Sequence, residues 1–352
     1  MKLESLLKAV LLAAALMQGT AFAADDAAAA VAAAKKPLAD WSVPPPAPTP
    51  AKGKSVYVIT CTSQGIGCVR AANGVKEAGE RLGWTVRVID GKGDPGTWNG
   101  AIQAAIAGGA SGIVIDAVPP MLVGDALVRA AQAKIPVVSI FNPLPSADSP
   151  VFAFVRPDHK AQGVLMAQWV TTDSGRKANV LIVEDKQFPE LAERVAGFKA
   201  EIAKCGGCKL VGSVESTIGT MAQRLAGAVA AELSRNPTVD YIVAPFDSNA
   251  FFVSEGVRQV GRTGKVKVAG YEGDPQALDA IRAGTQAMTI ANPAEWMGWQ
   301  AVDELNRAFN GQKFVNKPVP FRLIDKSNVP DTKGWMGDVD YKARYGALWK
   351  LP

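Results

Sequence analysis

The fold is decided by residues 55–90, SVYVITCTSQGIGCVRAANGVKEAGERLGWTVRVID, which predict a strand, a helix and a second strand. Val56 to Thr60 is a β-branched strand, and Val69 to Leu82 is a helix that Gly83 ends. Thr85 to Asp90 is again a strand, with apolar residues at Val86, Val88 and Ile89. Strands separated by helices form βαβ units, in which the strands run parallel and each crossover is right-handed.

The same alternation continues along the chain. In the first series we expect helices at 95–108 and 122–133 and strands at 112–116 and 136–140. A second series has strands at 179–184, 209–215, 241–244, 266–271 and 287–291, with helices at 161–172, 191–204, 220–234, 250–260, 275–283 and 296–310. Two series of similar size predict an α/β protein of two similar domains. Ligands bind beyond the carboxyl ends of parallel strands, so the cleft between the domains is the expected site.

The first 23 residues have the pattern of an export signal. Residues 1–8 hold two lysines and one glutamate, Ala9 to Met17 is apolar, and Ala21 to Ala23 reads A-F-A. This pattern is typical of a secretory signal peptide, and the apolar run is too short for a membrane span of about 20 residues. We expect cleavage after Ala23 and a mature chain in the periplasm. An uncleaved apolar anchor is the alternative.

Residues 24–54 are expected to be a linker. Residues 24–34 are almost all alanine, and residues 35–54 are rich in proline, including Pro44 to Pro46. Proline fixes φ and removes a hydrogen-bond donor, so the segment predicts a semi-rigid extended chain.

Composition and charge exclude several classes of protein. The net charge is +5, and the lysines and arginines are scattered, so no nucleic-acid partner is expected. His159 is the only histidine, and no G-x-S-x-G motif accompanies it. We therefore expect no enzyme activity, no metal site and no cofactor.

Four cysteines in an exported chain favour disulfides. Cys205 and Cys208 form a C-x-x-C between a helix and a strand, whereas a redox motif begins a helix, so a structural disulfide is expected and free thiols are the alternative. Cys61 and Cys68 are separated by a strand-to-helix loop, and their pairing depends on the geometry of that loop.

Candidate ligand-binding residues follow the carboxyl ends of the strands. They are Ser63, Gln64, Phe141, Asn142, Arg194, Phe246, Asp247, Glu272 and Asn292. Charged and amide groups bond hydroxyls, and phenyl rings cover C–H faces, so this mixture suits a polyhydroxylated ligand. Each residue also has a structural interpretation: the phenylalanines as core residues, Arg194 and Glu272 as surface charges, and Asn292 as a turn residue.

Several segments resemble the type I periplasmic sugar-binding proteins, the ribose-binding-like group of ABC importer components. They are NGVKEA at 73–78 with LGW at 82–84, AAQAKIPVVSIFN at 130–142, ERVAGF at 193–198, VAGYEG at 268–273 and TIANP at 289–293. The resemblance spans about Ser55 to Leu323. It implies two Rossmann-like lobes, 55–157 plus 293–317 and 158–292 plus 318–352 with the tail. Three crossovers near Pro157, Pro293 and Pro318 would form a hinge that closes on the ligand.

The resemblance also implies roles for single residues. Arg194, Glu272 and Asn292 take the places of a ligand-binding arginine, aspartate and glutamine. The chain departs from ribose-type members at Phe141-Asn142, where they have an Asp-Arg pair, and at Phe246, where they have an Asn. Gly67-Cys68 also replaces a Phe pair. We therefore expect a ligand with one apolar face: a deoxy or methylated sugar, a polyol or a small polar aromatic compound.

The function implied by the resemblance is binding without catalysis. The protein would be a monomer that captures a small polar molecule and delivers it to an ABC transporter permease. A ligand-sensing receptor of the same fold is the alternative. A secreted hydrolase would need a nucleophile with a base or a metal cluster, and the sequence offers neither. A LacI-type regulator would carry a DNA-binding headpiece where this chain has its signal peptide.

Overall fold

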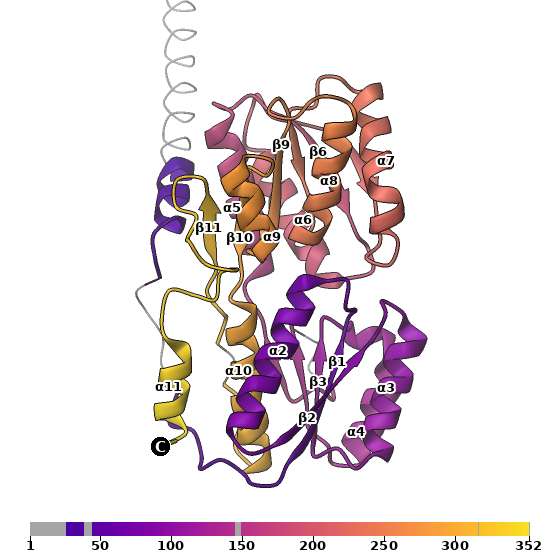
Figure 1. Ribbon diagram of the computed structural model, residues 1–352, viewed down its shortest axis with the longest axis vertical. Coiled ribbons are helices and arrows are strands. Elements are labelled where there is room, and N and C mark those ends of the chain that lie inside the picture. Colours follow the sequence, from indigo (N-terminus) through magenta and orange to yellow (C-terminus); the bar gives the residue numbers. More distant parts are fainter. Residues whose placement is uncertain (1–25, 39–43, 145–148, 316, 352) are drawn as a thin grey trace, which may run out of the picture.

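The protein has two lobes, each built on its own mainly parallel sheet, one above the other in Figure 1. The computed structural model describes residues 26–38, 44–144, 149–315 and 317–351, so the predicted signal peptide lies outside the described residues. The two-lobed α/β fold predicted from the sequence is confirmed. No helix within the described ranges is both long enough and apolar enough to cross a membrane.

The first lobe holds a five-stranded parallel sheet in the order β2-β1-β3-β4-β5. Its strands are β1 (Ser55–Thr60), β2 (Thr85–Asp90), β3 (Gly112–Asp116), β4 (Val137–Ile140) and β5 (Ala153–Val155). Its helices are α2 (Ile66–Arg81), α3 (Pro95–Ala107), the short η1 (Pro120–Leu122) and α4 (Gly124–Gln132). Every residue of β3 and β4 is buried, as expected for a sheet that is covered on both faces.

The second lobe holds a six-stranded sheet in the order β11-β10-β9-β8-β6-β7. Its strands are β6 (Asn179–Glu184), β7 (Lys209–Glu215), β8 (Tyr241–Val243), β9 (Lys267–Glu272), β10 (Met288–Ala291) and β11 (Arg322–Asp325). Its helices are α5 (His159–Asp173), α6 (Pro189–Ile202), α7 (Met221–Arg235), α8 (Asp247–Gln259) and α9 (Pro275–Ala283). Only β11 runs antiparallel to its neighbour, because it enters the sheet from the first lobe.

Helix α10 (Ala294–Phe309) returns the chain from β10 to the first lobe, where it lies beside α2 (Figure 1). Two glycines allow this close approach. A Cβ added to Gly74 would lie 2.2 Å from the carbonyl oxygen of Glu295, and one added to Gly298 would lie 2.4 Å from that of Ala71. Any larger residue at either position would push the two helices apart.

The alanine-rich segment differs from the extended linker predicted for it. Residues 26–34 form a helix beside β11, and Val31 packs into the core of the second lobe with 6% of its surface exposed (Figure 1). Alanine has the highest helix propensity of all residues, and Ala27 and Val31 bury one face of the helix. Because the segment has low sequence complexity, we predicted a linker where a packed helix forms.

Residues 44–54 of the proline-rich segment hold no helix or strand and lie against the first lobe. Arg307 of α10 donates from Nη2 to the carbonyl of Pro45 at 2.8 Å, and Trp84 donates from Nε1 to the carbonyl of Ala51 at 2.6 Å. The N-terminal segment therefore contacts both lobes.

The C-terminal tail also returns to the first lobe, although we grouped it with the second. In α11 (Tyr341–Leu348), Tyr341 stacks on Trp296 of α10 with 5.8 Å between ring centroids. Trp349 stacks on Trp299 at 5.4 Å. These aromatic pairs hold the tail against α10, and Figure 1 shows α11 lying alongside α10.

Candidate functional site

A cavity lies between the lobes, where the carboxyl ends of the two sheets face each other. The space between its atoms, including the part that opens outward, is about 400 Å³. The first lobe contributes Cys61, Gly65, Gly67, Cys68, Ala117 and Phe141 to its wall. The second lobe contributes Phe188, Glu190, Leu191, Arg194, Ile218, Phe246 and Glu272.

The structure brings part of the predicted set together in this cavity. Phe141, Arg194, Phe246 and Glu272 line it, from the ends of β4, β8 and β9 and from α6. The other predicted residues lie elsewhere: Ser63, Gln64, Asn142, Asp247 and Asn292 do not line the cavity. The cavity wall is therefore more apolar than the sequence suggested.

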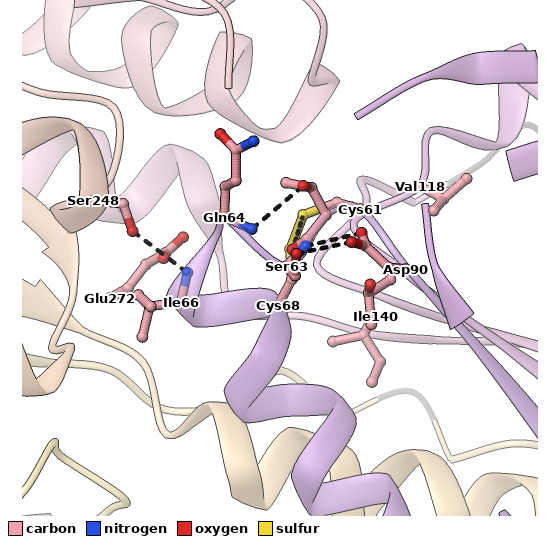
Figure 2. Close-up of a disulfide and its surroundings, with 12 residues drawn as sticks. Cys61, Ser63, Gln64, Ile66, Cys68, Asp90, Val118, Ile140, Ser248 and Glu272 are labelled. Carbon is pink, nitrogen blue, oxygen red and sulfur yellow. Dashed lines mark hydrogen bonds between the residues drawn. A yellow bond between two sulfur atoms is a disulfide. The ribbon is translucent and has the colours of Figure 1, made fainter. Parts of the chain in front are cut away.

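Ser63 and Gln64 turn away from the cavity. Ser63 donates to Asp90 from its backbone nitrogen at 3.0 Å and from Oγ at 2.8 Å, and the side chain of Gln64 is exposed. Figure 2 shows Ser63 directed at Asp90 and Gln64 extending away from it. The loop instead presents Gly65 and Gly67 to the cavity, and a Cβ on Gly67 would lie 2.4 Å from Oε2 of Glu272.

Asn142 and Asp247 support the backbone near the cavity. The buried Asn142 donates from Nδ2 to the carbonyl of Val118 at 3.0 Å and to Oγ of Ser139 at 2.9 Å. Asp247 accepts from the backbone nitrogens of Gly273 at 2.8 Å and Asp274 at 3.1 Å. Both side chains therefore hold loops rather than face the cavity.

Asn292 acts on the cavity through a neighbour. Its Oδ1 accepts from Nε2 of Gln162 at 2.5 Å, and Oε1 of Gln162 accepts from Nε of Arg194 at 3.2 Å. Arg194 also donates from Nη1 to the carbonyl of Pro245 at 2.8 Å and lies 4.8 Å from the ring centroid of Tyr271. The guanidinium is thus fixed before a ligand arrives.

Arg194 and Glu272 form the polar centre of the cavity. Nη1 of Arg194 lies 3.8 Å from Oε1 of Glu272, and both side chains are mostly buried. Burial raises the pKa of Glu272 well above its usual range, the nearby Asp274 raises it further, and Arg194 opposes this rise. The pair offers an acceptor and a donor side by side.

Three cavity residues, Ala117 with φ +49° and two others, have a backbone conformation that residues other than glycine rarely adopt. Phe141 has φ +69° and Glu272 has φ +109°. Hydrogen bonds hold both: the carbonyl of Phe141 accepts from Nε2 of His159 at 2.6 Å, and that of Glu272 accepts from the backbone nitrogen of Asn292 at 3.0 Å. Burial lowers the pKa of His159 well below its usual range, so its ring is neutral.

Sequence reasoning missed two buried carboxyl groups, Glu190 in the cavity wall and Asp116 next to the lining residue Ala117. Oε2 of Glu190, in the first turn of α6, has no hydrogen-bond partner among the described residues, and neither has either carboxyl oxygen of Asp116, at the end of β3. Burial raises the pKa of Glu190 to about 7 and that of Asp116 well above its usual range. The position of Asp116 at the carboxyl end of a strand was the signal that could have identified it.

The cysteines lie in two pairs at disulfide distance, Cys61–Cys68 and Cys205–Cys208, with Cα–Cα distances of 6.3 and 5.3 Å. The first pair lies in the wall of the cavity, between the end of β1 and the start of α2 (Figure 2). The second pair spans the turn between α6 and β7, outside the cavity wall. Within the described ranges, no group of three or more histidine, cysteine, aspartate or glutamate side chains is placed to hold a metal ion.

Comparisons with known proteins agree with this geometry. A family model described as periplasmic binding protein domain matches residues 56–313. The ribose import binding protein of Salmonella typhimurium is 24% identical over 260 residues, which cover 73% of this chain and 86% of that protein. The D-allose-binding periplasmic protein of Escherichia coli is 30% identical over 187 residues, 52% of this chain and 59% of that protein.

Solved structures show the same fold. An ABC transporter solute-binding protein from Burkholderia graminis in complex with D-arabinose has a TM-score of 0.73 and 22% identity, covering 80% of this chain and 99% of that one. A solute-binding protein from Bacillus halodurans with bound myo-inositol has a TM-score of 0.72 and 20% identity, covering 79% and 96%. Both compared proteins are therefore two-lobed binders of a small polyhydroxylated compound.

Proposed function

Because this chain belongs to the periplasmic binding protein domain family, we propose that it captures a small sugar, modified sugar or polyol between its lobes for an ABC importer. Members of this family are solute-binding components of transport systems, so the protein is not an enzyme. The relatives and solved structures named above take ribose, D-allose, D-arabinose and myo-inositol, which supports this ligand class. The partner in the membrane is the permease of the importer, and the signal peptide directs the chain to the periplasm.

The observation that carries this proposal is the Arg194–Glu272 pair in a cavity lined by phenyl rings. A guanidinium donor and a carboxylate acceptor 3.8 Å apart match two neighbouring hydroxyl groups. The rings of Phe141, Phe188 and Phe246 cover the C–H faces of the same ligand. We assign these five residues, with Glu190, to the binding site. The three rings support the expectation from the sequence that the ligand has one apolar face.

Hydrogen bonds join the two lobes beside the cavity, and we propose that a ligand enters after they break. Nε2 of Gln187 in the second lobe donates to the carbonyl of Gly93 in the first at 3.0 Å. The backbone nitrogen of Ile66 donates to Oγ of Ser248 at 3.4 Å, a bond drawn in Figure 2. We propose that the crossovers near Pro157, Pro293 and Pro318 bend as a hinge when these bonds break.

Thermal unfolding of the mature protein with a panel of compounds tests the proposal. The panel holds pentoses, hexoses, deoxy and methylated sugars, polyols and amino derivatives of each. A ligand that binds only the folded state raises its stability, so at least one compound at saturation raises the melting temperature by about 3 °C or more. No shift with any sugar, polyol or amino derivative would overturn the proposed function.

A further inference from the structure

The cavity holds more negative than positive groups. Two carboxyl groups, on Glu190 and Glu272, line it, and Asp116 directly precedes the lining residue Ala117; the guanidinium of Arg194 is the one cation among its described lining residues. Arg194 lies beside Glu272 and donates to the carbonyl of Pro245, so its positive charge compensates one of the three carboxyl groups. The excess at and beside the cavity is two carboxyl groups.

The two carboxyl groups in excess are buried and lack partners. Asp116 has no exposed surface, and Glu190 has 4%. Neither oxygen of Asp116 accepts a hydrogen bond from any described residue, and neither does Oε2 of Glu190. Buried polar atoms in folded proteins almost always have partners, because an unpaired buried charge is costly. The missing donors point to a ligand that supplies them.

These groups come from both lobes. Asp116 ends β3 in the first lobe, whereas Glu190 begins α6 and Glu272 ends β9 in the second. Asp116 is close enough to Glu272 and Glu190 for their charges to raise its pKa. Closure of an empty cavity therefore brings like charges together, and a cation between them would join the lobes.

We propose that the ligand carries a protonated amine on its polyhydroxylated body, as an amino sugar or amino polyol does. This inference rests on the proposed function and names its ligand class more closely. An ammonium group offers three N–H donors, for the unpartnered oxygens of Glu190 and Asp116 and for the carboxyl group of Glu272 in the cavity wall. The rings of Phe141 and Phe246 add attraction between the cation and their faces, and Arg194 takes a hydroxyl oxygen.

A neutral ligand satisfies the cavity less well. Hydroxyl groups donate one hydrogen bond each and bring no charge, so two uncompensated carboxylates remain buried when the lobes close. Protonation of these carboxyl groups is the alternative, and it is what the raised pKa values describe for the cavity without a ligand. If the carboxyl groups bind an ammonium group, the protein prefers an amine to the matched neutral compound. If they are protonated instead, the protein has no such preference.

Isothermal titration with matched pairs of compounds tests the proposal. The pairs are D-glucosamine with D-glucose, D-galactosamine with D-galactose, glucamine with sorbitol, and serinol with glycerol. The wild-type protein at pH 7.5 is expected to bind the amine of at least one pair about tenfold or more tightly than the neutral member. Equal or tighter binding of the neutral member in every pair that binds would overturn the proposal and leave the proposed function standing.

Variants show whether the carboxyl groups carry this preference. Asp116→Asn and Glu190→Gln keep the shape of the side chain and remove its charge, so each is expected to lower the preference for the amine about tenfold. Asp125→Asn changes an exposed carboxylate on α4 and serves as the matched control, with the preference unchanged. A preference that survives in both cavity variants would refute the proposal. If neither member of any pair binds, the amine proposal fails, whereas the proposed function fails only if the whole panel of sugars, polyols and amino derivatives gives no thermal shift.

Discussion

Arg70 of the first lobe donates from Nη1 to Oδ1 of Asp274 in the second lobe at 3.0 Å. The same guanidinium bonds both carboxyl oxygens of Glu295, at the start of α10, at 2.9 and 2.8 Å. Its Nη1 also donates to the carbonyl of Glu272 at 3.3 Å, next to the polar centre of the cavity. Arg70 therefore ties the two lobes together at the strand end that carries a cavity residue.

Replacing Arg70 with methionine is expected to lower the free energy of unfolding by about 3 kcal/mol, because Asp274 and Glu295 then lose their buried partner. Ligand affinity is also expected to fall, since the closed state loses a bond between the lobes. Urea denaturation and titration measure the two effects. Arg258→Ala, at an exposed position on α8, is the control. If the free energy of unfolding and the ligand affinity fall no further than in Arg258→Ala, Arg70 does not hold the two lobes together.

The stability of the ligand-free protein is expected to depend on pH through Glu190. Burial raises its folded pKa from 4.5 to about 7, with Arg194 opposing and Asp185 and Glu193 assisting. As the pH rises, the unfolded chain therefore loses this proton before the folded protein does. The contribution of protonated Glu190 to the free energy of unfolding is present below pH 4.5 and is lost as the pH rises to about 7.

Urea denaturation at several pH values checks this expectation. Glu190→Gln should match the wild type near pH 4.5 and should exceed its stability by about 2 kcal/mol at pH 8. A difference between the two proteins that does not change with pH would contradict the assignment.

Asn292 is expected to act on the ligand through Gln162 and Arg194. Asn292→Ala frees the amide of Gln162, so Arg194 loses part of its fixed position, and affinity is expected to fall about tenfold. A double-mutant cycle with Arg194→Ala measures the coupling. The double variant should bind no more weakly than Arg194→Ala alone. Additive losses would instead indicate that Asn292 contacts the ligand itself.

Both cysteine pairs are expected to be oxidised in the mature protein, so thiol counting on unreduced protein should find no free thiol. The pairs should differ in their effect on binding. Replacing Cys61 and Cys68 with serine loosens a loop in the cavity wall and should weaken binding. The same change at Cys205 and Cys208, outside the wall, should leave affinity unchanged. Four free thiols, or equal effects of the two replacements, would contradict this expectation.

The sequence predicted which loops meet at the cavity better than which side chains face it. Arg194, Glu272, Phe141 and Phe246 were found because the carboxyl ends of parallel strands share one edge of a sheet. Ser63 also follows such a strand, but the carboxylate of Asp90 captures its hydroxyl, and that contact joins distant parts of the chain. The residues that surround Ser63 in the sequence give no indication of its contact with Asp90.

The alanine-rich helix shows a second limit. Residues 26–34 were predicted as a linker because low complexity usually indicates a segment without a core. The burial of Val31 against the second lobe depends on a surface formed by residues more than 100 positions away. Helix propensity alone favoured the helix, and tertiary packing decided where it lies.

The central claim is that the closed interlobe cavity holds a small ligand at Arg194, and titration of Arg194→Ala tests it most directly. The ligand is the panel compound that gives the largest rise in melting temperature, and Arg258→Ala is the control for loss of a surface arginine. We predict that Arg194→Ala binds it about 30-fold or more weakly than the wild type, equivalent to about 2 kcal/mol, while Arg258→Ala binds it normally. Wild-type affinity in Arg194→Ala would contradict the account.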